Sequence, residues 1–247
     1  MSLNVQKSRR WFLSGTAVAL GGVALAGLVI APQLSSRAAE AAVVLPDPAL
    51  DVSAPAGAMQ VAVLAGGCFW GVQAVFQHTE GVIGAVSGYS GGTKDTANYD
   101  AVSSGRSRHA EAVEITFDPR KISYGKILKI FFSVVHDPTQ LDRQGPDHGP
   151  HYRSEIFAAN DEQKRVAQAY IAQLDQAKTF PRPIVTRLGK LDAFYAAEAY
   201  HQDYAARNPN AMYIAIHDRP KVENLKRHFA DVYRDKPVLV GASPKRG

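Results

Sequence analysis

The chemistry of this 247-residue chain centres on its single cysteine, Cys68, which lies in the stretch LAGGCFWGVQAVF. A lone cysteine cannot form an internal disulfide, so it is either a small apolar filler or is kept for its sulfur chemistry. The short apolar run at 60–65 ends in two glycines, and apolar residues then recur at helical spacing. The thiol is therefore expected in the first turn of a helix, where unpaired N–H groups and the helix dipole favour a thiolate with a lowered pKa.

A glutamate on a predicted strand is the second candidate. Residues 109–119 alternate as a strand does, and strand parity places Glu111 on the same face as the apolar residues at 113, 115 and 117. A carboxyl removed from water has a raised pKa and can donate a proton at neutral pH. Periodicity equally allows Glu111 to lie past the strand end, in water or paired with Arg106 or Arg108.

Polar loops supply the remaining candidates. The segment at 136–154, HDPTQLDRQGPDHGPHYRS, is crowded with histidine, aspartate, glycine and proline, and its spacing fits no zinc or calcium pattern. We interpret it as an active-site loop. Most tyrosines are half-buried packing residues, and spacing alone does not separate the loop tyrosines from that group; they are Tyr99, Tyr152 and Tyr204.

Both helices and strands are predicted to position these residues. A helical stripe of apolar residues follows Ser123. Asn160 and Gln163 form a capping box for a helix through Leu174, and a last helix follows Pro220. The mixture of elements predicts an α/β fold, a two-layer α+β sandwich.

The beginning of the chain does not read as part of this fold. Two adjacent arginines, Arg9 and Arg10, precede an apolar run at 11–31 that is rich in glycine and alanine. This pattern resembles a bacterial twin-arginine export signal, and the small residues Ala39 and Ala41 favour cleavage over an uncleaved anchor. The domain is therefore expected in the periplasm, or at the inner membrane if the signal is retained.

Charge and composition divide the chain into four parts. Four of the 28 basic residues and one of the 23 acidic residues lie in 1–41, which leaves 24 against 22 and indicates no nucleic-acid partner. A linker rich in proline and alanine is predicted over 42–59, a single domain over 60–234 and a loose tail over 235–247.

The order of several motifs resembles that of the A-type peptide-methionine sulfoxide reductases: GCFWG, GYSGG, NYDAVSSG, HAEAV, HDPTQLDRQGPDHG, YRS and YHQDY. The resemblance covers nearly the whole domain. It implies a ferredoxin-like core with extra helices and long loops, and reduction of the S epimer of methionine sulfoxide in peptides and proteins. It implies no metal or organic cofactor, and we expect a monomer.

The same resemblance implies a role for each candidate side chain. Cys68 would be the nucleophile, Glu111 the acid, Tyr99 and Tyr152 donors to the sulfoxide oxygen, and Asp147 a supporting group, while Phe69 and Trp70 would hold the S-methyl group and His201 and Tyr204 would line the site.

The sequence departs from the family pattern in three places. Arg108 stands where glycine is usual, and Pro150 and His151 replace a threonine-glutamine pair, which we expect to alter the rim of the site. The C-terminal part lacks the resolving cysteines that many relatives carry. Regeneration of Cys68 from a sulfenic acid must then come from an external thiol, such as a thioredoxin-like protein.

Two functions of other classes are compatible with the residues alone. A cysteine hydrolase that used Cys68 with a histidine would cleave esters or peptides through an acyl-enzyme. A non-catalytic exported binding domain would keep its properties when Cys68 is replaced by alanine.

Overall fold

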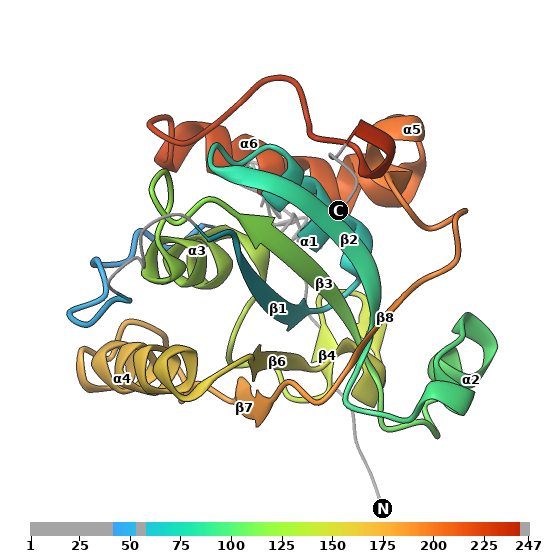
Figure 1. Ribbon diagram of the computed structural model, residues 1–247, viewed down its shortest axis with the longest axis horizontal. Coiled ribbons are helices and arrows are strands. Elements are labelled where there is room, and N and C mark those ends of the chain that lie inside the picture. The colour runs from blue at the N-terminus through green and yellow to red at the C-terminus, as the bar shows by residue number, and fades with distance from the viewer. Residues whose placement is uncertain (1–41, 53–57, 243–247) are drawn as a thin grey trace, which may run out of the picture. The chain divides into compact units, whose positions relative to one another are not determined.

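The computed structural model describes residues 42–52 and 58–242, so the expected export signal at 1–41 lies outside the described residues. Within the described ranges no helix is long and apolar enough to cross a membrane. Figure 1 shows the arrangement of the helices and strands. In chain order they are β1 (Gln60–Gly66), α1 (Phe69–Gln77), β2 (Val82–Ser90), α2 (Tyr99–Ser103), β3 (Ala110–Phe117), α3 (Tyr124–Ile130), β4 (Arg143–Gln144), β5 (Asp147–His148), β6 (Ser154–Ala158), α4 (Asp161–Gln176), β7 (Arg187–Lys190), β8 (Phe194–Ala196), α5 (Tyr204–Arg207) and α6 (Arg219–His228).

The main sheet has the strand order β7-β6-β1-β3-β2-β8, in which β6 and β7 are parallel and the other neighbours are antiparallel. Its four central strands lie in the order β6-β1-β3-β2; along the chain α1 connects β1 to β2, a long loop that carries α2 connects β2 to β3, and α3 lies between β3 and β6. This is the ferredoxin-like order. The strands β1, β3 and β2 run side by side in Figure 1. The mixed α/β fold expected from the sequence is confirmed.

The hydrophobic core lies between the sheet and one layer of helices. Leu64 of β1 pairs with Val113 of β3, and both belong to a large buried cluster that also includes residues of α1, α3, α4 and α6. On the opposite face of the sheet a smaller cluster forms around Ala112 and Phe157. The alternation of β3 between these two clusters is the pattern that the sequence predicted.

Side chains cap the N-termini of two helices, α3 at Ser123 and α4 at Asn160. Ser123 Oγ accepts a hydrogen bond from Lys126 N at 3.1 Å, and Asn160 Oδ1 accepts one from Gln163 N at 2.8 Å. Each cap satisfies a backbone N–H that has no partner inside the helix. The reciprocal half of the predicted box differs, because Gln163 Oε1 accepts from Ala159 N at 3.0 Å.

Two of the predicted helices are extended by π-helical segments. The apolar stripe after Ser123 is α-helical to Ile130 and continues as a π-helical segment, Phe131–Val135. The last helix is preceded by another, Ile214–Asp218, and α6 itself begins at Arg219 rather than after Pro220. π-Helical turns are rare and occur often at functional sites.

The segment at 42–52 is packed against α3 and α4, which corrects its interpretation as a linker. Leu45 is only 2% exposed and belongs to the large core cluster. The hydroxyl of Tyr170 donates to Pro46 O at 2.9 Å, and Asp51 Oδ1 accepts from Gly125 N, in the first turn of α3, at 2.7 Å. Figure 1 shows this segment, in blue, beside α3. The sequence prediction failed here because it rested on the proline- and alanine-rich composition, whereas the segment is held by the contacts of a few single residues, Leu45, Pro46 and Asp51.

The segment at 235–242 is also attached to the domain, so the prediction of a loose tail is wrong for these residues. Val238 N donates to Gln77 O at 3.0 Å, and Val240 N donates to Asp203 Oδ1 at 3.1 Å. Both contacts lie beside elements that carry candidate site residues, α1 and α5. The rest of the predicted tail lies outside the described residues.

Candidate active site

Cys68 lies where β1 turns into α1, immediately before the first helical residue. Gly67 makes this junction possible: its φ is +91°, and a Cβ at that position would lie 2.6 Å from Gln144 Cβ. The position of the thiol is the one predicted from the sequence. Cys68 is only 8% exposed, however, so the surrounding loops cover most of it.

Glu111 of β3 points to the start of the helix that follows Cys68. Its Oε2 accepts a hydrogen bond from Phe69 N at 3.0 Å, and the residue is 3% exposed. Burial raises the pKa of Glu111 to about 8, against the opposing effect of the Phe69 N–H, while Asp147 and Asp218 raise it further. Glu111 is therefore mostly protonated at pH 7. The alternatives of a solvated or arginine-paired Glu111 are wrong.

The ionisation of Cys68 differs from the sequence prediction. Burial, with smaller contributions from Glu111 and Asp218, raises the pKa of the Cys68 thiol well above its ordinary value. A hydrogen bond from the Trp70 backbone acts in the predicted direction but does not outweigh them. The expected thiolate is therefore wrong for the resting protein, in which Cys68 is a thiol.

Aromatic side chains from α1, from α5 and from the segments on either side of α5 form one wall of the site. Trp70 stacks on Tyr204 with ring centroids 3.9 Å apart and an interplanar angle of 13°. The Trp70 indole N–H donates to His201 Nδ1 at 3.3 Å, and the edge of His201 meets Phe69 at 5.0 Å. The four residues that were expected to bind substrate are thus brought together. The ring of Tyr213 packs edge-to-face with that of Trp70, with the ring centroids 5.9 Å apart.

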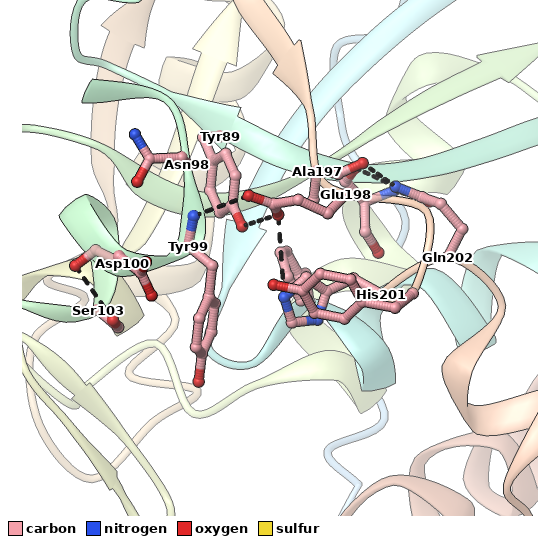
Figure 2. A network of polar contacts seen from close by, with 12 residues as sticks. Tyr89, Asn98, Tyr99, Asp100, Ser103, Ala197, Glu198, His201 and Gln202 are labelled. Carbon is pink, nitrogen blue, oxygen red and sulfur yellow. Dashed lines mark hydrogen bonds and ion pairs between the residues drawn. The ribbon is translucent and has the colours of Figure 1, made fainter. Parts of the chain in front are cut away.

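Glu198 connects Tyr99 and His201 to Tyr89, which lies on the strand β2 (Figure 2). It accepts hydrogen bonds from Tyr99 N at 3.0 Å and from the Tyr89 hydroxyl at 2.9 Å. His201 Nε2 lies 3.9 Å from Glu198 Oε2. Burial lowers the pKa of His201, so its ring is neutral at pH 7 and this contact is not an ion pair. The ring of Tyr99 lies 4.9 Å from that of His201, at the edge of the aromatic wall.

Tyr152 and Asp147 approach the thiol from the loop at 136–154. Tyr152 ends a short 3₁₀ turn, Pro150–Tyr152, and burial, followed by the nearby Glu111 and Cys68, raises the pKa of its phenol. The phenol is therefore a neutral hydrogen-bond donor. Asp147 Oδ2 accepts a hydrogen bond from the hydroxyl of Tyr213, which ties the loop to the chain segment before α6.

The residues that depart from the family pattern lie at the border of this loop. Arg108 and Pro150 are exposed, whereas His151 is buried, with its ring 4.1 Å from that of Tyr152. The backbone of Arg108 is fixed by Arg153, whose Nη2 donates to Arg108 O at 3.0 Å. Their effect on substrate access stays a prediction.

Sequence reasoning missed three polar residues of the site: Glu198, Tyr213 and Asp218. Each acquires its place from a contact with an element distant in the sequence, and none lies in a pattern that marks it locally. The only sequence signal was the position of Glu198 just before the YHQDY motif.

The groups around Cys68 suit reduction better than hydrolysis. The acid beside the thiol is protonated and can donate a proton, whereas a cysteine hydrolase needs a base there. Among the described residues, no cluster of histidine, cysteine and carboxylate side chains could hold a metal ion. The fold and the site define a cysteine-dependent oxidoreductase of the mixed α/β class.

The chain belongs to the peptide methionine sulfoxide reductase family. The family model described as "Peptide methionine sulfoxide reductase" matches residues 60–233. The sequence is 59% identical over 181 residues to peptide methionine sulfoxide reductase MsrA 2 of Mesorhizobium japonicum, covering 73% of this chain and 93% of the relative. It is 52% identical over 191 residues to MsrA 2 of Synechocystis sp., covering 76% and 89% of the two chains.

Solved structures support the same assignment. The fold is similar to methionine sulfoxide reductase A of Corynebacterium diphtheriae, with a TM-score of 0.54 and 30% identity over 68% of this chain and 84% of that one. Reduced Mxr1 from Saccharomyces cerevisiae has a TM-score of 0.58 and 28% identity over 68% and 96%. The protein is therefore an oxidoreductase that reduces methionine sulfoxide with thiols, and the hydrolase and binding-domain alternatives are wrong.

Proposed function

We propose that the protein reduces the S epimer of methionine sulfoxide, free and in proteins, and that the substrate's oxygen passes to Cys68 as a sulfenic acid. The observation that carries this proposal is the buried Glu111, which is hydrogen-bonded to Phe69 N one residue after the thiol. The S epimer follows from the similarity to relatives of the A type.

The first step moves two electrons and one oxygen atom. The Cys68 sulfur attacks the sulfoxide sulfur, and negative charge develops on the sulfoxide oxygen, which leaves readily only when it is protonated or strongly hydrogen-bonded. Glu111 donates its proton to that oxygen, and the proton of the Cys68 thiol restores Glu111. The hydroxyl group then moves from the substrate sulfur to the Cys68 sulfur: the substrate S–O bond and the transient bond between the two sulfurs break, a Cys68 S–O bond forms, and one electron pair stays on the methionine sulfur. The products are methionine and the Cys68 sulfenic acid, so Cys68 is oxidised by two electrons and no proton is consumed overall.

The surrounding side chains orient the substrate for this step. The neutral phenols of Tyr99 and Tyr152 donate hydrogen bonds to the sulfoxide oxygen as its charge grows. Phe69 and Trp70 hold the S-methyl group, with His201 and Tyr204 behind them. Asp147, held by Tyr213, supports the loop that carries Tyr152.

Regeneration requires two equivalents of an external thiol, because Cys68 is the only cysteine of the chain. The first thiol attacks the sulfenic acid, releases water and forms a mixed disulfide with Cys68. The second releases the Cys68 thiol and leaves an oxidised disulfide. A thioredoxin-like protein supplies both sulfurs in one molecule, and we propose a reductant of that kind.

The decisive experiment compares the separated S and R sulfoxides of N-acetylmethionine, each incubated with the protein and dithiothreitol and then analysed by chromatography. We expect turnover of the S epimer and none of the R epimer. Cys68→Ser should be inactive while its circular dichroism spectrum remains that of the wild type. Equal turnover of the two epimers, or activity in the serine variant, would refute the proposal.

We also propose that the protein acts outside the cytoplasm, where it repairs oxidised exported proteins. The support is the pair Arg9-Arg10 before an apolar run and the small residues that follow it. Cell fractionation should find the wild type in the periplasm or at the inner membrane, and the doubly substituted Arg9→Lys, Arg10→Lys variant in the cytoplasm. A wild-type protein confined to the cytoplasmic fraction would contradict this location.

A further inference from the structure

Asp218 is a buried acid that neither the motifs nor the proposed reaction uses. It ends the π-helical segment before α6 and is 1% exposed. Neither of its carboxylate oxygens has a hydrogen-bond partner among the described residues. Burying a charged group without such partners costs several kcal/mol in general, so its retention calls for a physical reason.

The carboxylate of Asp218 is pressed against the first turn of α1. A Cβ built on Gly71 would lie 2.2 Å from Asp218 Oδ1, so this close approach requires glycine at position 71. Gly71 lies in the helical turn that follows Cys68. Asp218 thus places a negative charge beside the helix start from which the thiol projects.

A single cation compensates this charge in part. Lys221 Nζ lies 3.5 Å from Asp218 Oδ1, longer than an ordinary hydrogen bond, and the lysine side chain is itself 13% exposed. Burial raises the pKa of Asp218 to about 6, while Lys221 lowers it. At pH 7 Asp218 is therefore mostly ionised.

The titratable groups that face Asp218 come from several elements. Lys221 lies on α6 and Tyr213 on the segment before it, and His136, at the end of the π-helical segment packed against α6, faces Lys221. His78 and Arg219 line the cavity of about 300 Å³ that borders Asp218 on its other side. The remaining groups are Cys68, Glu111 and Asp147, and the charge of Asp218 raises the pKa of both Cys68 and Glu111.

We propose that Asp218 is a positioning residue that keeps Cys68 and Glu111 protonated between turnovers, because its buried charge opposes a second negative charge on either group. This inference rests on the roles of Cys68 and Glu111 in the proposed function. A protonated thiol reacts slowly with peroxide and with other electrophiles, since the thiolate is the nucleophile. Glu111 meanwhile retains the proton that the sulfoxide oxygen needs. Asp218 thus slows the reaction of Cys68 with peroxide and other electrophiles, while Glu111 keeps the proton that the reaction with a sulfoxide requires.

The test measures the alkylation of Cys68 by iodoacetamide as a function of pH, in the wild type and in Asp218→Asn. We expect the apparent pKa of the thiol to fall by about one unit in the variant, which makes alkylation at neutral pH about tenfold faster. The alkaline limb of kcat/KM for the S sulfoxide, which reports the loss of the Glu111 proton, should move to lower pH in the same variant. A merely structural role would move neither profile.

Two further variants keep the test decisive. Asp231→Asn is the matched control, because Asp231 is an exposed acid that pairs with Lys126 at 3.0 Å and should leave both profiles unchanged. Asp218→Ser removes the same charge with a smaller side chain, so it should shift the pKa of the Cys68 thiol in the same direction as Asp218→Asn, and it replaces that variant if the asparagine protein does not fold.

An alkylation profile that matches the wild type in the folded variants would overturn the proposal. Alkylation involves no sulfoxide chemistry. A failure of the proposed function would instead appear as a wild-type protein that does not reduce the S sulfoxide.

Discussion

Replacing Glu111 by glutamine should slow the formation of the Cys68 sulfenic acid by about two to four orders of magnitude, the usual contribution of a general acid. Glutamine has nearly the same shape, and its amide oxygen can still accept the hydrogen bond that Phe69 N donates at 3.0 Å. The substitution therefore preserves the start of α1 and removes the transferable proton. With a pKa of about 8, the wild-type carboxyl is about tenfold more protonated than ionised at pH 7, so nearly the full effect is visible there.

The loss corresponds to about 3 to 5 kcal/mol of transition-state stabilisation. The assay is a single turnover with the S sulfoxide, stopped by rapid quenching and followed by the trapping of the sulfenic acid with dimedone. Substrate binding should change much less than the rate. Glu114→Gln, on the same strand but on the other face, is the matched control and should react at the wild-type rate. A wild-type rate in Glu111→Gln would refute the assignment of Glu111 as the proton donor.

Three other predictions concern pH, stoichiometry and stability. Because the folded state raises the pKa of Glu111 from 4.5 to about 8, the contribution of Glu111 to the free energy of unfolding should fall by about 1.4 kcal/mol per unit as the pH rises between those values; thermal unfolding of Glu111→Gln should lack this part of the pH dependence. Without added thiol, turnover should stop after one substrate per protein, with mass spectrometry showing one added oxygen at Cys68, and repeated turnover would contradict the account of regeneration. Leu45→Ala should lower the free energy of unfolding, measured with urea, by about 2 to 5 kcal/mol. Val44→Ala, at a residue that is 73% exposed, should leave it nearly unchanged. Equal effects of the two substitutions would show that the contacts of residues 42–52 do not stabilise the fold.

Local patterns predicted the position of the thiol and the burial of the acid. Gly66 and Gly67 mark the end of β1, and helical spacing after them places Cys68 at the helix start. The period of two in β3 placed Glu111 on the buried face. These features depend on neighbours within a few residues, so the sequence alone contains the information.

The ionisation of the site could not be predicted in the same way. The helix start alone predicts a lowered thiol pKa, and the structure reverses that direction through burial and through Glu111 and Asp218. The hydrogen bond of Tyr213 to Asp147 likewise joins segments that only the folded chain brings together. A pKa depends on all charges and solvent within several ångströms, whereas a sequence motif reports only the nearest neighbours along the chain.

The attachment of residues 42–52 means that the part of the chain that stabilises the fold extends beyond the residues that the family model matches. The family match begins at residue 60, but Leu45 contributes to the core and Asp51 caps the first turn of α3 from outside that match. A gene fragment cut at the family borders would encode all the proposed catalytic residues and would leave the α3 and α4 side of the domain uncovered. Recombination between relatives at residue 60 would exchange the proposed catalytic residues, and it would separate the core from the segment 42–52 that packs against α3 and α4.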